Sequence, residues 1–518
     1  MQGFIDFVLE NRAKILELSL EHLKLTLISL LLACLIAVPL GIWIVRRQRL
    51  ANGILGFAGL LQTIPSIALL GSLIPLLGIG VKPAILALLL YAILPILQNT
   101  YTGIQGVSPA VKEAARGMGM TRLQALRSVS LPLALPVIMA GIRTAAVINV
   151  GVATLAAYIG AGGLGEFIFG GIALNNNYMI LAGALPAALM ALLFDQLLGR
   201  LRKVKWRAAY GLLLIPVLLG LAWRPAIQQH ALQAAFDPEF ADRADGLPSI
   251  QQQYPSLQFN TLILNAGLLY KAVAEEEVDF ISGYSTDGRV QAYQLKVLED
   301  DQHAFPPYHC AALLNGATAT NHPELVSTLE LLAGKMSDSL MTSLNYQVDH
   351  LQRSPAEVAK TFLESQQLWR APNTANANTT ITIGSKLFSE QYILVEIFKQ
   401  LIEGHTSLQV DPKPGLGGTK ICYDALRTGE IDLYPEYTGT GFQVLLQPSD
   451  SLRTAIFTDA GAVYDYVKTA CAERDQVQWL SPLGFNNTYA IMCRQDQAER
   501  NGWERLSDLE VRRREVGK

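Results

Sequence analysis

Long uncharged hydrophobic runs fill the first part of the chain and end near Trp223, whereas charged residues recur every few positions in the remainder. About 20 apolar residues are enough to cross the hydrocarbon core of a membrane. The second run is broken by Pro65 and Pro75, and the sixth has only 16 residues. We expect about six membrane spans, over residues 25–45, 51–81, 83–98, 135–158, 178–194 and 208–223.

Basic residues cluster after the first, third and fifth of these runs, at positions 46–49, 112–127 and 200–207. Loops on the cytoplasmic side of a membrane carry an excess of Lys and Arg. If all three clusters lie inside the cell, the N-terminus lies outside, and six spans leave everything after residue 224 outside as well. If the run 208–223 were not a span, the second half of the chain would be cytoplasmic instead.

The second half alternates short β-rich runs with amphipathic helices, which is typical of a two-lobed α/β domain. Strands are predicted over residues 278–281, 381–384 and 430–434. A helix is predicted over residues 389–403, because its apolar and charged residues fall on opposite faces at helical spacing. The apolar face comprises Ile393, Leu394, Ile397, Phe398 and Leu401, and the charged face comprises Glu396, Lys399 and Glu403.

Composition also predicts where the domains end. The change near Trp223 separates a membrane domain, residues 1–224, from the rest of the chain. A polar segment without charge, residues 371–380, has the composition of a linker. We therefore expect the α/β domain to consist of two parts, residues 225–370 and 381–518, on either side of this linker.

Several classes of function are excluded by composition and spacing. The net charge of −3 offers no basic surface for nucleic acid. The five cysteines form no Cys-x-x-Cys pair and the seven histidines show no ligand spacing, so neither a metal site nor a disulfide framework is expected. The glycine-rich run at 415–420 has the wrong spacing for a phosphate loop, and Ile421 stands where Ser or Thr is needed. We expect no catalytic residue, no cofactor and no ATP hydrolysis by this chain itself.

A charged segment, residues 113–132, separates the third and fourth predicted spans. Its spacing resembles the coupling loop of ABC importer permeases: Glu-Ala-Ala, a Gly four residues after the second Ala, and a later Leu-Pro. In that family the loop forms two short helices that dock on a separate cytoplasmic ATPase subunit, which the resemblance implies as a partner. The alternative is an ordinary soluble turn. The implied docking residues are Glu113, Ala114, Ala115, Gly119, Leu131 and Pro132.

Sequence blocks across the second half resemble the glycine betaine/choline/carnitine class of substrate-binding proteins. The blocks are Ser-Lys-x-Phe-x-Glu-Gln at 385–391, Gly-Leu-Gly-Gly-Thr-Lys at 415–420, Tyr-Pro-Glu-Tyr-Thr-Gly-Thr at 434–440, Gly-Phe-Asn-Asn-Thr-Tyr at 484–489, Ala-Asp-Arg-x-Asp-Gly at 241–246, Tyr-Ser-Thr-Asp-Gly at 284–288 and Phe-Pro-Pro-Tyr at 305–308. The first half resembles the permease subunit of the same importers.

This resemblance implies a MetI-like ABC permease of about six spans, fused to a two-lobed α/β periplasmic-binding-protein domain of type II. It implies a bacterial cytoplasmic (inner) membrane protein with the binding domain on the outer face, a permease homodimer, and import of a small quaternary ammonium or betaine-like compound. Fused members of the family include ergothioneine importers, which are an alternative. A binding-only receptor and a defective fusion are two further alternatives.

The order of the blocks departs from the family. In relatives the block at 385–391 begins the binding domain, and the blocks at 241–246 and 305–308 end it. Here the later part comes first, so the domain resembles a circularly permuted one. Permutation is tolerated when the old termini lie close together and the new ends are at the surface. A tandem pair of truncated domains and a chain interrupted by a frameshift are the alternatives.

A quaternary ammonium group donates no conventional hydrogen bond, so dispersion and cation–π contact with aromatic faces must hold it. A ligand carboxylate would need a donor such as Arg243 or Lys386. The arginine could instead pair with Asp242, Asp245 or Asp287. The sequence does not choose among glycine betaine, proline betaine, choline, carnitine and ergothioneine. The candidate binding residues are Tyr284, Tyr308, Tyr437, Tyr489, Arg243, Lys386, Asn487, Thr440 and Gln391.

Overall fold

The computed structural model describes residues 2–174, 176–201, 232–373 and 379–510. The chain divides into two compact units, one of Met1–His230 with Leu262–Asn265, the other of Ala231–Thr261 with Ala266–Lys518. The predicted boundary at residue 224 and the middle of the predicted linker lie outside the described residues. The predicted division into domains therefore stays a prediction.

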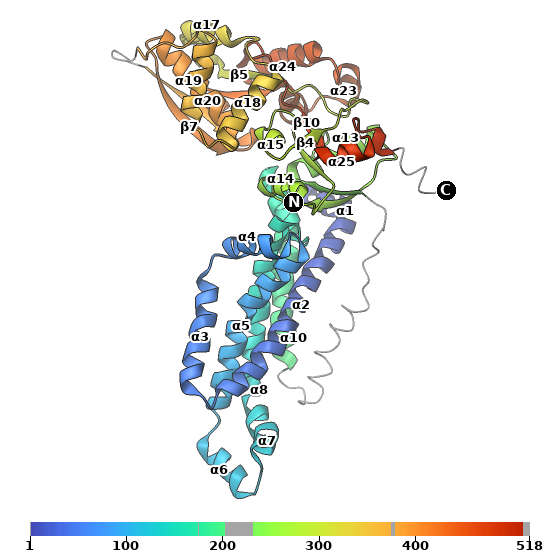
Figure 1. Ribbon diagram of the computed structural model, residues 1–518, viewed down its shortest axis with the longest axis vertical. Coiled ribbons are helices and arrows are strands. Elements are labelled where there is room, and N and C mark those ends of the chain that lie inside the picture. The colour runs from blue at the N-terminus through green and yellow to red at the C-terminus, as the bar shows by residue number, and fades with distance from the viewer. Residues whose placement is uncertain (1, 175, 202–231, 374–378, 511–518) are drawn as a thin grey trace. The chain divides into compact units, whose positions relative to one another are not determined.

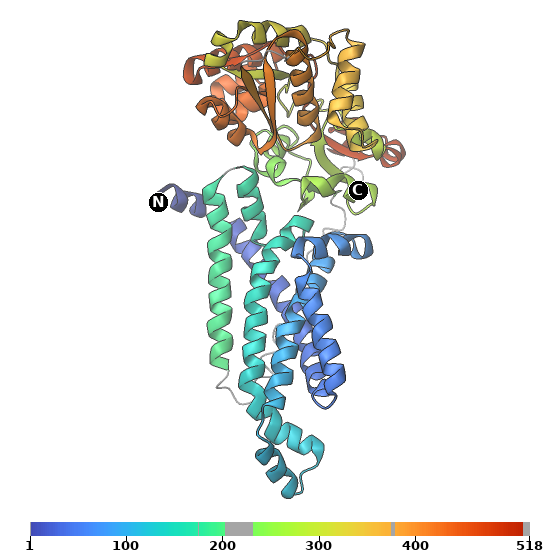
Figure 2. The same cartoon turned by 90° about the vertical axis from the view of Figure 1, so that its left-hand side faces the viewer.

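The first unit is built of long helices that run side by side (Figures 1 and 2). Four described helical segments are long and apolar enough to cross a membrane, and they correspond to the first, third, fourth and fifth predicted spans. The run 208–223, predicted as the sixth span, lies outside the described residues. The helices are α1 (Gln2–Glu10), α2 (Arg12–Ile44), α3 (Gln48–Thr63), α4 (Ser66–Leu77), α5 (Val81–Gln105), α6 (Pro109–Gly117), α7 (Arg122–Ala125), α8 (Leu131–Ala153), α9 (Gly165–Ala173) and α10 (Asn177–Leu201).

The second predicted span is broken into α3 and α4, which meet at an angle of 98°. The break falls at Pro65, and Ile64 before it adopts extended backbone with φ −69° and ψ 126°. A residue that precedes proline is pushed out of the helical region by the proline ring, so α3 ends there. If the bent pair counts as one span, the described part of the chain holds five candidate spans.

Small residues let the long helices approach one another closely. A Cβ added to Gly141 on α8 would lie 2.5 Å from the backbone oxygen of Pro95 on α5. A Cβ added to Gly41 on α2 would lie 2.7 Å from the side chain of Thr100, also on α5. Close contact at small residues is how membrane helices pack where lipid removes the hydrophobic driving force.

The second unit contains two five-stranded sheets, with strand orders β2-β1-β3-β10-β4 and β7-β6-β8-β5-β9. In the first sheet β10 pairs antiparallel with β3 and β4, and in the second β5 pairs antiparallel with β8 and β9. Each sheet thus takes one strand from the other half of the domain. The strands are β1 (Leu232–Phe236), β2 (Phe259–Ile263), β3 (Phe280–Tyr284), β4 (Leu295–Val297), β5 (Cys310–Asn315), β6 (Thr380–Lys386), β7 (Gln409–Gly417), β8 (Leu433–Tyr437), β9 (Val477–Trp479) and β10 (Tyr489–Arg494).

This strand exchange joins the two halves into one two-lobed α/β domain. The circularly permuted order stays a prediction, because the same pairings would form with the halves in either order. Helices cover the sheets, and the bounds of the α-helices of this unit follow. They are α12 (Pro238–Asp242), α13 (Leu247–Gln253), α14 (Ala266–Ala274), α15 (Gly288–Ala292), α16 (Gly316–Asn321), α17 (Pro323–Leu329), α18 (Asp338–Asp349), α19 (Pro355–Ser365), α20 (Ser389–His405), α21 (Thr419–Thr428), α22 (Thr438–Thr440), α23 (Asp450–Ile456), α24 (Ala460–Asp475) and α25 (Gln495–Asn501).

The predicted helix over 389–403 is confirmed as α20, and all five residues of its predicted apolar face are fully buried. The predicted strand at 381–384 lies within β6. The strands predicted at 278–281 and 430–434 exist, but they begin later, at Phe280 and Leu433. In the second case Gly429, at φ +78°, caps α21, and the Ile431 amide still donates to the Ala425 carbonyl of that helix.

Candidate functional site

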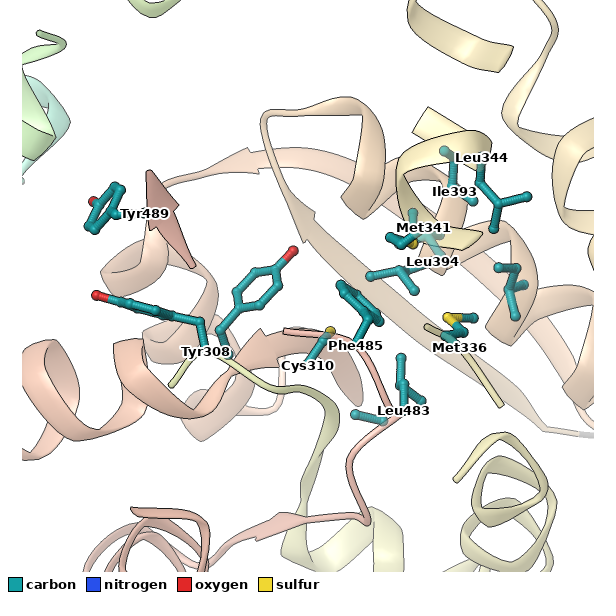
Figure 3. Close-up of a cluster of buried hydrophobic side chains, with 14 of the residues drawn as sticks. Tyr308, Cys310, Met336, Met341, Leu344, Ile393, Leu394, Leu483, Phe485 and Tyr489 are labelled. Carbon is teal, nitrogen blue, oxygen red and sulfur yellow. The ribbon is translucent and has the colours of Figure 1, made fainter. Parts of the chain in front are cut away.

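Three of the predicted tyrosines meet where strands end and the chain crosses between lobes. Tyr284 ends β3 and Tyr489 begins β10, directly opposite one another in the antiparallel register. Their rings stack with centroids 5.2 Å apart and planes 20° apart. The ring of Tyr308, just before β5, lies edge-to-face with that of Tyr489 at 5.7 Å. Figure 3 shows Tyr308 and Tyr489 together at one end of a buried hydrophobic cluster.

Phe388 connects the fourth tyrosine to these three. Its ring stacks on Tyr284 at 6.1 Å and on Tyr437 at 6.3 Å, so one series of ring contacts joins residues from both lobes. We call Tyr284, Tyr308, Phe388, Tyr437 and Tyr489 the aromatic cluster. The structure therefore brings all four predicted tyrosines together. Sequence reasoning did not select Phe388, although its place in the block at 385–391 was an available signal.

Arg243 is buried and bound to carboxylates. Its guanidinium donates to both oxygens of Asp245, at 2.9 and 2.6 Å, and to Glu239 at 2.6 Å. Tyr308 donates its hydroxyl hydrogen to the same Asp245. Burial alone would raise the pKa of Asp245, but Arg243 beside it holds that pKa below its usual range. The ion pair considered as an alternative from the sequence is thus present, while a contact of Arg243 with a ligand stays a prediction.

Lys386 and Gln391 also have partners within the domain. The Lys386 ammonium lies 2.6 Å from Glu436 and 5.1 Å from the ring centroid of Tyr437. The Gln391 side chain accepts from the backbone amide of Lys386 and donates to the Tyr437 hydroxyl. Thr440 is buried in α22, directly after β8. Their contacts with a ligand stay predictions.

Glu390, which sequence reasoning did not select, accepts four hydrogen bonds although it is only 3% exposed. One carboxylate oxygen accepts from the Tyr437 hydroxyl at 2.6 Å and from Asn487 Nδ2 at 2.8 Å. The other accepts from the Thr286 hydroxyl at 2.7 Å and from Asn345 Nδ2 at 2.9 Å. Burial raises the pKa of Glu390, and the hydrogen bonds oppose that rise. The signal available in the sequence was its place beside Gln391.

Asn487 remains open on one side. Its amide nitrogen donates to Glu390, whereas its buried Oδ1 has no hydrogen-bond partner among the described residues. A free amide oxygen can accept from a ligand hydroxyl or amine but offers nothing to a ligand carboxylate. The predicted hydrogen bond from Asn487 therefore fits a donor group on the ligand best.

A further carboxylate belongs to the lobe that holds Tyr284. Asp237 follows β1 and caps α12, where it accepts from the Phe240 amide at 3.0 Å. Burial and the nearby charge of Glu239 raise the pKa of Asp237 to about 6. This group therefore titrates close to neutral pH.

The predicted coupling segment forms two short helices, α6 and α7, at one end of the helical unit (Figures 1 and 2). Gly119 reverses the chain between them at φ +77°, a conformation that L side chains adopt at a cost. Thr121 then begins α7 with a capping box completed by Gln124. Leu131 and Pro132 open α8 after a π-helical turn.

The segment from α6 to α7, residues 109–125, which we call the α6–α7 elbow, carries both charged and exposed apolar side chains. Glu113 and Ala114 are exposed, whereas Ala115 is packed inside. Met118 and Leu123 are 69% and 54% exposed. Apolar side chains gathered on an otherwise charged segment are typical of a docking surface. The docking role of these residues stays a prediction.

Two family models match this chain. One, described as the substrate binding domain of an ABC-type glycine betaine transport system, matches residues 224–365 and 379–516, more than half of the chain. The other, described as the inner membrane component of binding-protein-dependent transport systems, matches residues 33–204. The chain belongs to the ABC-type glycine betaine transport family. It carries the permease and the substrate-binding domain of that family on one polypeptide.

Individual relatives resemble the permease half. An osmoprotectant import permease of Salmonella typhimurium is 49% identical over 205 residues, 39% of this chain and 95% of the relative. A choline transport system permease of Bacillus subtilis is 46% identical over 199 residues, 38% of this chain and 92% of the relative. A solved glycine betaine/carnitine/choline ABC transporter structure is 37% identical, covers 27% of this chain and 52% of that one, and has a TM-score of 0.23.

Membership of this family fixes the coarse description of the molecule. It is a multi-pass membrane transport component with a MetI-like helical permease domain and a type II periplasmic-binding-protein domain of two sheets. As the permease of an ABC importer it works with an ATPase partner.

Proposed function

We propose that this chain is the permease and substrate-binding subunit of an ATP-driven importer for quaternary ammonium compounds such as glycine betaine, choline or carnitine. The aromatic cluster carries the proposal. It gathers five rings from both lobes, with neighbouring centroids 5.2 to 6.3 Å apart. Aromatic rings gathered from separate segments provide the faces that hold an alkylated ammonium group.

The charges around the cluster favour a cation in it. Arg243 and Lys386 are each paired with buried carboxylates, so their positive charges are already balanced. Glu390 adds a carboxylate whose four donors are neutral. Since a buried negative charge is costly, a positive ligand group nearby offsets that cost. The quaternary ammonium is therefore the part of the ligand that this site binds.

The same proposal places the two functional regions on opposite sides of the membrane. The binding domain takes up its ligand at the outer face of the bacterial inner membrane and delivers it to the permease spans of a homodimer. The α6–α7 elbow receives the ATPase at the cytoplasmic face, as its basic residues and exposed apolar side chains support. Ligand drives closure of the lobes only through a higher affinity for the closed form.

Transport by the reconstituted protein tests this function. The full chain is placed in proteoliposomes with its ATPase, and uptake of radiolabelled choline, glycine betaine, proline betaine, carnitine and ergothioneine is measured with and without ATP. We expect ATP-dependent uptake of at least one quaternary ammonium compound. Binding without uptake would indicate a receptor, uptake of ergothioneine alone would indicate the alternative substrate, and binding of none of the compounds would contradict the proposal.

A further inference from the structure

Glu390 differs from Asp245 and Glu436, two other buried carboxylates near the aromatic cluster, in the partners that it has. Asp245 and Glu436 each face a basic side chain at 2.6 Å. The four donors to Glu390 are a phenol, a hydroxyl and two amides, all of them neutral. A buried carboxylate is ordinarily paired with a cation, because removal of its charge from water is costly. Among the described residues, Glu390 thus has four hydrogen-bond donors, but none of these donors carries a positive charge that would balance its own.

One of these donors belongs to the aromatic cluster itself. Tyr437 gives its hydroxyl hydrogen to Glu390 at 2.6 Å, and its ring stacks on Phe388. A hydrogen bond to a charged acceptor is stronger than a neutral one and fixes the ring in one orientation. It also shifts electron density from the hydroxyl into the ring, which increases the attraction between the ring face and a cation. Glu390 therefore acts on a ligand through Tyr437.

The contacts of Glu390 also extend to both lobes. Tyr437 ends β8 of the second sheet, whereas Thr286 follows β3 and Asn487 precedes β10 of the first sheet. The carboxylate thus holds its negative charge where the two lobes meet. A charge at this depth is weakly screened by solvent and salt.

We propose that Glu390 is a positioning and specificity-determining residue, which makes the site prefer a cationic ligand head to an uncharged group of the same shape. It does so by orienting and enriching the Tyr437 ring and by supplying a negative charge that the ligand balances. The inference rests on the proposed function, since it concerns the same ligand site.

The test compares each quaternary ammonium compound with the carbon isostere in which an uncharged tert-butyl group replaces the trimethylammonium head. Choline is paired with 3,3-dimethylbutan-1-ol, and glycine betaine with 3,3-dimethylbutanoate. Calorimetry on the purified full chain gives the affinity of the ammonium compounds, and displacement of a bound radiolabelled compound gives that of the isosteres. Wild type and Glu390→Gln are measured side by side, because the amide keeps the size of the side chain and removes its charge.

We expect Glu390→Gln to weaken binding of the ammonium compound at least tenfold, about 1.4 kcal/mol, and to weaken binding of the isostere less than twofold. An equal loss for both members of a pair, or no loss for the ammonium compound, would overturn the inference. If wild type binds neither of these two compounds, the pair is built on whichever of the five compounds of the transport test it does bind; if it binds none of the five, the proposed function fails and the inference fails with it. Wild-type binding with unchanged selectivity in the variant would overturn the inference alone.

Two further variants keep the test decisive if Glu390→Gln folds poorly. Tyr437→Phe leaves the carboxylate in place but removes its link to the ring, and we expect a several-fold loss confined to the ammonium compound. Asp475→Asn is the control, since Asp475 accepts from Tyr423 of a separate buried cluster at 2.8 Å and is paired with Arg427 and Arg474. We expect Asp475→Asn to prefer the ammonium compound over its isostere by the same factor as wild type. A selective loss in the control, or none in Tyr437→Phe, would contradict the assignment.

Discussion

The proposed ligand site depends on single side chains. Some of them could be predicted from their residue type, and others could not. Tyrosines and basic residues within the matched blocks were predictable, because a cation needs aromatic faces and a carboxylate needs donors. Whether Arg243 and Lys386 are free or paired depends on which carboxylates fold beside them. That depends on contacts such as Lys386 to Glu436, which are distant in sequence. For the same reason Glu390 was missed.

The ring of Tyr284 stacks on two other rings of the aromatic cluster, those of Tyr489 and Phe388. We expect Tyr284→Ala to weaken binding of the transported ammonium compound by at least tenfold, about 1.4 kcal/mol, because one aromatic wall is lost. Calorimetry on the full chain measures this. Tyr293→Ala serves as the control, since that ring is 41% exposed and lies outside the aromatic cluster. Equal affinities of wild type and Tyr284→Ala would count against the cage.

Asp237 makes stability depend on pH in a direction that can be predicted. Its pKa of about 6 lies above the ordinary value of 3.8, so the folded protein favours the neutral form. The stability that this neutral form contributes is fully present below about pH 4 and is lost as the pH rises through about 6. Asp237→Asn stays neutral and can still cap α12.

Thermal unfolding of the purified full chain in detergent, at a series of pH values, measures this difference. We expect Asp237→Asn to melt at a temperature close to that of wild type at about pH 4 and to gain on wild type towards pH 7. A difference that stays constant over this range would show that Asp237 does not titrate there.

At the scale of elements, hydrophobic patterns predicted the long helices of the first unit and α20 in the second. The long helices and α20 could be predicted because each depends on a hydrophobic pattern within its own stretch of sequence. Strand limits were less predictable, because β8 begins only after the turn that ends α21. Within that turn, the Asp432 carboxylate accepts hydrogen bonds from the Thr382 amide of β6 and from the Thr318 hydroxyl. The bend between α3 and α4 was visible as Pro65, but its angle was not.

The α6–α7 elbow gives a prediction at this scale. Gly119→Ala places a Cβ on left-handed backbone, which costs about 1 to 2 kcal/mol and distorts the turn that presents both helices. We expect ATP-dependent uptake to fall severalfold while ligand affinity stays unchanged. Gly117→Ala is the matched control, because that glycine ends α6 without a positive φ and a Cβ there meets nothing within 4 Å. Equal loss of uptake in both variants would contradict a specific role for the turn.

The whole molecule depends on pairings that no local pattern contains. β10 completes the first sheet and β5 completes the second, so neither half of the binding domain has a complete sheet without the other. The sequence indicated two halves in a permuted order only through the resemblance of their blocks to a family. Which strands exchange followed from the structure, because pairing across such distances is set by tertiary packing.

The direction of transport rests on an even number of membrane spans. The sequence predicts a sixth span at 208–223, which would take the chain to the outer face if the basic cluster at 200–207 lies inside, as its positive charge predicts. We therefore expect alkaline phosphatase fused after residue 518 to be active in cells, and a green fluorescent protein at the same place to stay dark. The same reporters fused after a chain ended at Gly117 should give the opposite result, because the proposal places the elbow in the cytoplasm. A fluorescent C-terminal fusion would place the aromatic cluster and the elbow on one side of the membrane, and import driven by a cytoplasmic ATPase could then not begin with ligand capture outside.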